Sequence, residues 1–397
     1  MGSKHLEGIR VVELGTHVAV PKVSRVMADW GAEVIKVEPP KGEPLRKMGP
    51  GYNMPDPDDH NPIFQCENMN KKSITINLKS EEGHKAMLEL IKTADVFLSN
   101  TRPRSLKKLG IWYEDLKAVK PDLIYGHLTA YGEDGPEKDS PGFDVAAYWA
   151  KSGATVEWIL DSEVPFKPMP GMGDSTAAGY LLSAINAALF RRERTGEGEF
   201  IQASLYSTAL WCNSIGVLCG QPRYGHKYPK EMHIDPLFPP YRCKDGVWVT
   251  ACSPSWDALY PIAFKILGLE DRIGDPYLHS KDAAREHYTE VCALIAEKWA
   301  QFDSKDLIQK FTEAGQVVAK MSSPHDLWQD EQAWANDYLA HVTLEDGADL
   351  VVPRTPIYFN DVPTADLHLA PQLAVDNQEI LGSLGLSEEE IHLASGR

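Results

Sequence analysis

Hydrophobic and polar positions follow two different periods along the first 130 residues of the chain. Short runs rich in Val, Ile and Leu alternate with stretches in which apolar residues recur every three or four positions. The first pattern is typical of β-strands and the second of amphipathic helices. Together they predict strands at residues 9–14, 33–38, 73–78, 95–99 and 122–131, and helices at residues 22–30 and 81–93.

This alternation of strand and helix predicts an α/β fold. Repeated βα units form a mostly parallel sheet covered by helices, here a Rossmann-like large domain accompanied by a smaller α+β domain. In such a sheet the ligand crevice lies at the carboxyl ends of the strands. The loops that follow Leu14, Leu78 and Ser99 are therefore the expected binding loops.

The second half of the chain predicts a long helix, an irregular segment and a new structural unit. An alanine-rich helix is expected at residues 175–194, followed by a strand at 199–205. The Pro-, Gly-, His- and Tyr-rich residues 220–240 are typical of a linker or an active-site segment. A hairpin around residues 244–246 and three helical runs come next. We expect the large domain to comprise residues 1–219, the small domain 241–316, and the chain to return to the large domain over 317–397.

Composition excludes several classes of function. The chain has 397 residues and a formal net charge of −17, which disfavours binding to nucleic acid or to an anionic membrane. It has no long apolar span and no apolar signal-peptide core, so we predict a cytoplasmic protein. Six cysteines without CxxC spacing predict neither a metal site nor a disulfide.

An N-terminal βαβ unit raises the possibility of a dinucleotide site. Glu38 ends the second predicted strand, where an acid that binds a ribose would stand. The loop after the first strand, however, contains only Gly15 of the usual glycine-rich fingerprint. We therefore expect neither a nicotinamide nor a flavin cofactor.

Two basic clusters offer contacts for a phosphorylated ligand. One spans residues 70–73 and the other residues 100–108. Arg makes forked contacts to phosphate and Lys supplies a point charge. The alternative is that both clusters are solvated basic faces of an acidic protein.

Asp174 is the strongest candidate for a chemical role. It lies in Pro170-Gly171-Met172-Gly173-Asp174, directly before the predicted long helix. Glycines permit close approach to the backbone, and the first helical turn favours a negative charge, so a carboxylate here is expected to stay ionised. The ordinary alternative is that Asp174 is the N-cap of the helix.

Several segments taken together resemble the class III CoA-transferase family (CaiB/BaiF type), which includes formyl-CoA transferase. The resemblance covers nearly the whole chain and depends on the order of its segments, which are residues 6–13, 28–38, 70–73, 100–103 and 171–196.

The resemblance implies a function as well as a fold. Asp174 would attack an acyl-CoA thioester, forming an aspartyl anhydride and then an aspartyl-CoA thioester, from which CoA passes to an acceptor acid. Two subunits would interlock as rings in a homodimer, each with a Rossmann-like large domain built from both ends of the chain. Coenzyme A would be bound by His17, Val18, Asn70, Lys71, Lys72, Asn100, Thr101, Arg104, Lys108 and Lys138.

The chain also departs from that family. Ala19 stands where some members have a glutamine, and Gly225 is the one glycine of residues 224–240, where members have a glycine-rich lid. A related racemase is an alternative, but it needs a histidine where this chain has Phe143. A CoA-binding protein without turnover is a second alternative. Tryptophans near Asp174 in sequence favour an aryl, branched 2-hydroxy or steroid acid as acceptor.

Overall fold

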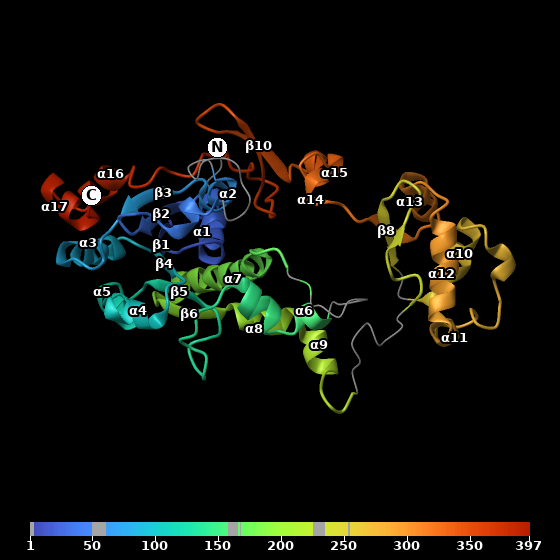
Figure 1. The fold of residues 1–397 in the computed structure, drawn as a ribbon. Helices are drawn as coiled ribbons and strands as arrows, with labels where there is room; N and C mark the ends of the chain where they lie inside the picture. The colour runs from blue at the N-terminus through green and yellow to red at the C-terminus, as the bar shows by residue number, and fades with distance from the viewer. Residues whose placement is uncertain (1–3, 50–60, 158–165, 167, 225–234, 253–254) are drawn as a thin grey trace. The chain divides into compact units, whose positions relative to one another are not determined.

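The computed structural model describes residues 4–49, 61–157, 166, 168–224, 235–252 and 255–397, which form two compact units (Figure 1). The larger unit contains residues 1–155, 167–218 and 331–397, and the smaller contains residues 156–166 and 219–330. Much of the segment predicted as a linker, including Gly225, lies outside the described residues.

The larger unit is built on a six-stranded parallel sheet. Its order is β3-β2-β1-β4-β5-β6, the order of a doubly wound α/β sheet. The strands are β1 (Arg10–Leu14), β2 (Glu33–Glu38), β3 (Lys72–Thr75), β4 (Val96–Ser99), β5 (Ile124–Thr129) and β6 (Glu199–Ser204). The prediction of a parallel α/β sheet is therefore confirmed.

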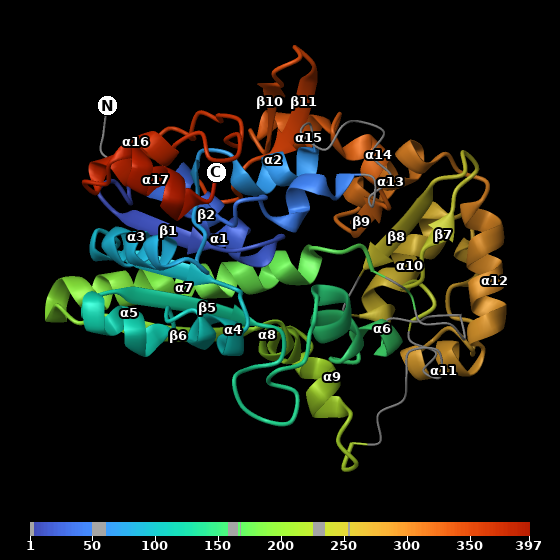
Figure 2. The same cartoon turned by 60° about the vertical axis from the view of Figure 1, so that its left-hand side comes forward.

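Helices cover both faces of this sheet, as Figure 2 shows. One face packs against α1 (Ala19–Asp29), α7 (Met172–Thr195), α8 (Leu205–Cys212) and the π-helix η4 (Val145–Ala150). The other face packs against α3 (Glu81–Lys92), α4 (Pro103–Lys108), α5 (Tyr113–Val119), α16 (Asn377–Ser383) and α17 (Glu388–Ser395). The C-terminal helices therefore belong to the core of the N-terminal sheet.

Shorter elements complete the larger unit. They are η1 (Pro44–Lys47), α2 (Pro62–Asn68), α6 (Ala154–Glu157), α9 (Ser214–Cys219), α15 (Glu331–Ala335) and the antiparallel pair β10 (Leu339–Thr343) and β11 (Asp349–Pro353). The bounds of α6 and α9 extend into residues assigned to the smaller unit. Gly347 has a φ of 86° in the turn that joins β10 to β11.

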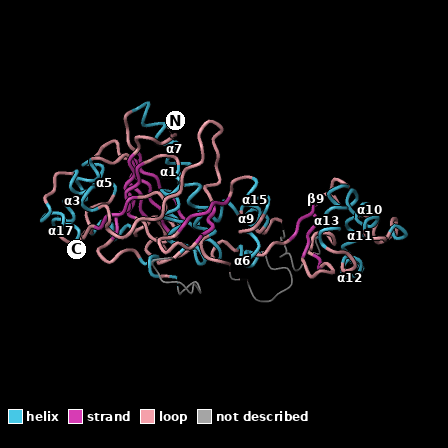
Figure 3. The backbone as a smooth tube through the Cα atoms, turned by 90° about the horizontal axis from the view of Figure 1, so that it is seen from above, coloured by secondary structure: helices cyan, strands magenta, loops and turns pink. Residues whose placement is uncertain are grey.

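The smaller unit has its own core around a three-stranded antiparallel sheet. Its strands are β7 (Tyr241–Arg242), β8 (Trp248–Cys252) and β9 (Val317–Lys320), and its helical segments are α10 (Trp256–Ile266), η5 (Glu270–Arg272), α11 (Lys281–Glu286), α12 (Tyr288–Trp299), α13 (Ser304–Glu313) and α14 (Pro324–Leu327). The predicted hairpin at residues 244–246 is present. Figure 3 colours the helices, strands and loops of both units.

The end of the small unit differs from the prediction. The expected boundary at residue 317 falls at the start of β9, which pairs with β8 from Cys252↔Val317 to Val249↔Lys320. The unit consequently continues to residue 330. The short strand was missed because a four-residue edge strand in mixed sequence gives little periodic signal.

Candidate active site

The start of helix α7 places Asp174 on the first turn rather than before it. The helix begins at Met172, and its N-cap is Gly171, whose φ of 99° suits glycine. Asp174 is thus the third helical residue, and the N-cap interpretation of the sequence is wrong. Among the described residues, none donates a hydrogen bond to its partly exposed carboxylate.

Asp144, and not Asp174, accepts hydrogen bonds from the free backbone N–H groups at the start of α7. Its Oδ2 accepts hydrogen bonds from the N–H groups of Gly171 at 2.7 Å and Gly173 at 3.2 Å. Asp144 is almost fully buried and lies directly before η4. A carboxylate from a distant segment therefore fixes the helix start that carries Asp174.

Gly173 is required by a close packing contact. A Cβ at this position would lie 2.5 Å from Cγ of Tyr148, which belongs to η4. Asp144 and the Tyr148 ring together leave little freedom for the first turn of α7.

The electrostatics around Asp174 oppose its ionisation. Burial and the negative charges of Asp144 and Glu67 raise the pKa of Asp174 to about 7, against the partial compensation of Lys22. The sequence led us to expect that the helix terminus keeps this carboxylate ionised. With a pKa of about 7 the carboxyl group is mostly protonated at acidic pH, so the expectation is wrong there. The result is a carboxylate that is unpaired and poised to change charge near neutral pH.

The loop between β1 and α1 lies beside this helix start. A Cβ on Gly171 would come within 3.9 Å of Val18, and the ring of His17 meets the ring of Phe143 edge-on at 5.3 Å between centroids. Phe143 is 65% exposed and Met172 is 64% exposed. Asp174 thus stands among exposed apolar side chains near the carboxyl edge of the sheet.

The loops after β1 and β4 are joined across the point where the strand order reverses. The side chain of Asn100 accepts the Thr16 N–H at 3.0 Å and donates to the Thr16 carbonyl at 2.9 Å. The Thr101 carbonyl contacts His127 Nε2 at 2.8 Å. Asn100 and Thr101 lie at the carboxyl edge of the sheet, as predicted. The side chain of Asn100 and the carbonyl of Thr101 are, however, already hydrogen-bonded within the protein.

The second basic cluster also lies at this edge. Arg104 and Lys108 are exposed on α4, which follows β4, and Lys138 is exposed in the loop after β5. Neither Arg104 nor Lys108 forms an ion pair with any described residue. These cations remain available to a ligand.

The first basic cluster does not follow a strand. Asn70, Lys71 and Lys72 precede or begin β3, so this cluster lies in none of the expected binding loops, which follow strands. Lys72 pairs with Glu33 at 2.9 Å and with Glu379 at 2.7 Å. The Asn70 side chain donates to Asp29 at 2.7 Å. Their sequence signal reflects internal ion pairs and hydrogen bonds.

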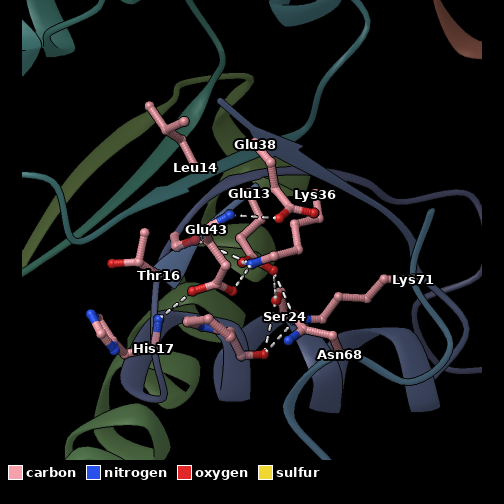
Figure 4. Close-up of polar contacts among 12 residues, drawn as sticks. Glu13, Leu14, Thr16, His17, Ser24, Lys36, Glu38, Glu43, Asn68 and Lys71 are labelled. Carbon is pink, nitrogen blue, oxygen red and sulfur yellow. Dashed lines mark hydrogen bonds and ion pairs between the residues drawn. The ribbon is translucent and has the colours of Figure 1, made fainter. Parts of the chain in front are cut away.

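Lys71 belongs to a buried polar network beneath the β1 loop, shown in Figure 4. Its Nζ donates to Glu13 at 2.8 Å, to the Pro21 carbonyl at 2.8 Å and to Asn68 at 2.9 Å. Lys36 binds the other oxygen of Glu13 at 2.8 Å. Although burial alone opposes ionisation, the two lysines lower the pKa of Glu13 to about 2.

Glu38 is also held inside this network rather than presented to a ligand. Its carboxylate receives hydrogen bonds from Arg46 at 2.7 and 2.8 Å and from Ser73 at 3.0 Å. The sequence analysis missed Glu43, Lys36 and Arg46 as partners. Charged residues inside predicted parallel strands, where apolar side chains are usual, are the signal from which Lys36 was recognisable.

Two further findings concern the described part of the chain. No group of three or more His, Cys, Asp or Glu side chains is arranged there to hold a metal ion. None of the helices it contains is long and apolar enough to cross a membrane.

Comparisons with known proteins show which proteins this chain resembles. The sequence model of CoA-transferase family III matches residues 6–377. The chain is 35% identical over 98% of its length to (R)-2-hydroxy-4-methylpentanoate CoA-transferase of Clostridioides difficile, of which 97% is covered. It is 34% identical over 97% of its length to cinnamoyl-CoA:phenyllactate CoA-transferase of Clostridium sporogenes, of which 94% is covered. A crystal structure of a CAIB/BAIF family protein from Brucella suis aligns over 96% of this chain and 100% of its own, with a TM-score of 0.81 and 27% identity.

Proposed function

Since the chain belongs to CoA-transferase family III and is an enzyme of that class, we propose that it moves CoA from an acyl-CoA to a free carboxylic acid by covalent catalysis at Asp174. The observation that carries this proposal is the unpaired carboxylate of Asp174. It lies at a helix start that Asp144 fixes through hydrogen bonds to the N–H groups of Gly171 and Gly173. A nucleophile needs an accessible lone pair and a fixed position, and this arrangement supplies both.

The proposed first half-reaction exchanges the donor acid for the enzyme carboxylate. An oxygen of Asp174 attacks the thioester carbonyl, the C–S bond breaks and the CoA thiolate leaves, so that an aspartyl anhydride forms. The thiolate then attacks the aspartyl carbonyl of the anhydride. The donor carboxylate leaves, and an aspartyl-CoA thioester remains.

The second half-reaction repeats these steps with the acceptor. The acceptor carboxylate attacks the aspartyl-CoA carbonyl, the thiolate leaves and a second anhydride forms. The thiolate then attacks the acceptor's acyl carbonyl, which releases the new acyl-CoA and regenerates Asp174. No proton is consumed overall, because each step exchanges one anionic leaving group for another.

We place CoA along the carboxyl edge of the sheet. His17 and Val18 of the β1 loop, the main chain of Asn100 and the side chain of Thr101 in the β4 loop, and the cations Arg104, Lys108 and Lys138 form this proposed site. Free cations in an acidic protein support it, because pyrophosphate and 3′-phosphate groups need local positive charge. For Asn70, Lys71 and Lys72 we propose a structural role in place of direct contact, because their side chains are bound internally.

We propose an aryl or branched 2-hydroxy acid as the acceptor. The names of the two relatives specify 2-hydroxy-4-methylpentanoate and phenyllactate as their acids. The exposed apolar side chains of Phe143 and Met172 beside Asp174 suit such acyl groups. A racemase needs a second proton-transferring group where Phe143 lies, and a phenyl ring cannot transfer a proton.

We also propose that the protein is a homodimer. Tyr180 and Phe190 are exposed on α7, as are Trp211 on α8 and Ile215 on α9. Large apolar side chains exposed on several helices of one unit are typical of surfaces that contact another protein chain. Light scattering coupled to size-exclusion chromatography should give twice the mass of the chain.

The test of the catalytic proposal is intact mass after incubation with an acyl-CoA and trapping with hydroxylamine or borohydride. Wild type and the surface control Asp282→Asn should yield a hydroxamate or a reduced side chain that peptide mapping assigns to Asp174, and Asp174→Asn should yield neither. An equal adduct on Asp174→Asn would show that another group is the nucleophile. Absence of any adduct during measurable CoA exchange would refute covalent catalysis.

A further inference from the structure

The β1 loop adopts a backbone conformation that its own residues do not favour. His17 has a φ of 62°, a left-handed conformation that side chains other than glycine rarely adopt. The following helix α1 receives no side-chain cap. Something outside the loop must therefore hold it in place.

Three side chains fix three consecutive residues of this loop. Lys36 Nζ donates to the Gly15 carbonyl at 3.1 Å, Asn100 binds both backbone groups of Thr16, and Glu43 accepts the His17 N–H at 2.8 Å. We call Lys36, Glu43 and Asn100 the loop clamp. Each comes from a different segment, so the clamp exists only in the folded chain.

Glu43 is the member that joins the clamp to the buried network. Its Oε1 lies 2.8 Å from Lys36 Nζ, and its own N–H donates to Glu38 at 3.0 Å. Glu43 and Lys36 are almost fully buried. In such surroundings a charge-assisted hydrogen bond is strong and its geometry is narrowly defined.

We propose that Glu43, held by Lys36, is a positioning residue that presets the β1 loop for CoA, an inference that rests on the proposed CoA site. The N–H groups of Val18 and Ala19 have no acceptor among the described residues, so Glu43 orients a loop whose next donors are free. A preset loop spares the ligand the entropic cost of ordering it. Glu43 itself touches neither CoA nor the acyl group and acts through His17.

The chain offers a matched control at the other end of β1. Asp95 accepts the Arg10 N–H at 2.8 Å and pairs with Arg192 at 3.0 Å. It makes the same two types of contact as Glu43, but at the amino edge of the sheet. Asp95→Asn therefore tests whether the loss of any carboxylate that binds the backbone of β1 or its loop gives the same effect.

The experiment measures CoA affinity by calorimetry, the KM for acyl-CoA and kcat, and amide hydrogen exchange of the β1 loop. In Glu43→Met we expect Kd and KM to rise about tenfold, kcat to change less than about threefold, and exchange at His17 to accelerate. Glu43→Gln keeps an oxygen that can accept the His17 N–H and should recover part of the affinity. Asp95→Asn should retain wild-type Kd and KM.

The double variant Lys36→Met/Glu43→Met removes both buried charges together. It keeps the test valid if Glu43→Met alone fails to fold. We expect it to show the same rise in the Kd for CoA. An unchanged Kd in the folded variants while wild type binds CoA would overturn the inference and leave the proposed function standing. Wild type that binds no CoA would overturn the proposed site itself. An equal rise in KM for Asp95→Asn would also overturn the inference, since it would indicate a general loss of stability.

Discussion

Replacing Asp174 with asparagine should make the protein more stable at alkaline pH while abolishing catalysis. The raised pKa of Asp174, about 7, means that the folded structure disfavours its charged form. The native protein therefore keeps a proton that the unfolded chain loses near pH 4. The contribution of this carboxyl group to the free energy of unfolding is fully present below its pKa in the unfolded chain. It is lost as the pH rises through its pKa of about 7 in the folded protein. Asparagine is neutral throughout and escapes this loss.

The magnitude follows from the size of the shift. A rise from 3.8 to about 7 is about three pKa units, or about 4 kcal/mol between the fully protonated and fully ionised limits. Because the carboxylate is only partly buried, solvent screens some of this repulsion. We therefore expect the difference in unfolding free energy between Asp174→Asn and wild type to grow by about 2 kcal/mol, in favour of the variant, as the pH rises from 5 to 8.

Urea unfolding of both proteins at pH 5, 6, 7 and 8 measures this difference. Other titrating groups are common to the two proteins and largely cancel, provided that the slope with denaturant is equal. Ser175→Ala, on the same helical turn, changes no charge and should differ from wild type by a constant amount. A stability difference for Asp174→Asn that stays constant from pH 5 to 8 would refute the assignment of a buried, repelled carboxylate.

Four further variants separate the effects of charge, packing and ligand contact. In wild type, kcat/KM for acyl-CoA should fall about tenfold per pH unit below the nucleophile's pKa of about 7, and Asp144→Asn should move this limb to lower pH because it removes a neighbouring negative charge. Gly173→Ala should cost about 1–3 kcal/mol of stability in urea unfolding, since its Cβ would overlap the ring of Tyr148, and kcat should fall with it. Lys71→Met should destabilise the protein by about 3–5 kcal/mol, because it breaks a buried ion pair. Lys108→Met should leave unfolding within about 0.5 kcal/mol of wild type while raising the KM for acyl-CoA; the opposite ranking of these two lysines would contradict their assigned roles.

The sheet was predictable because its signal is local. Parallel strands buried on both faces give near-continuous apolar runs, and each predicted strand from 9–14 to 199–205 overlaps an observed one. β9 and the extent of the small unit were not predictable in this way. Their assignment depends on pairing between segments about 65 residues apart in the chain, which leaves no periodic mark in the sequence.

The sequence identified the basic residues but did not show which of them are buried and which are exposed. Lys71 and Lys108 look alike in a sequence, since each stands in a run of basic residues between predicted elements. The structure binds Lys71 to Glu13 inside the protein and leaves Lys108 exposed after β4. What separates them is the position of an acidic partner on β1, which the local sequence does not record.

Asp174 shows the same limit in the chemistry of the site. A carboxylate in the first turn of a helix is ordinarily stabilised by the free amides there, and this reasoning predicts a lowered pKa. Asp144, from a segment about 30 residues earlier, accepts two of those N–H groups and adds its own negative charge. The helix terminus is thus satisfied by one acid while a second remains unpaired beside it. That division explains how one short turn holds both a rigid support and a basic carboxylate, which is the better nucleophile once it is ionised.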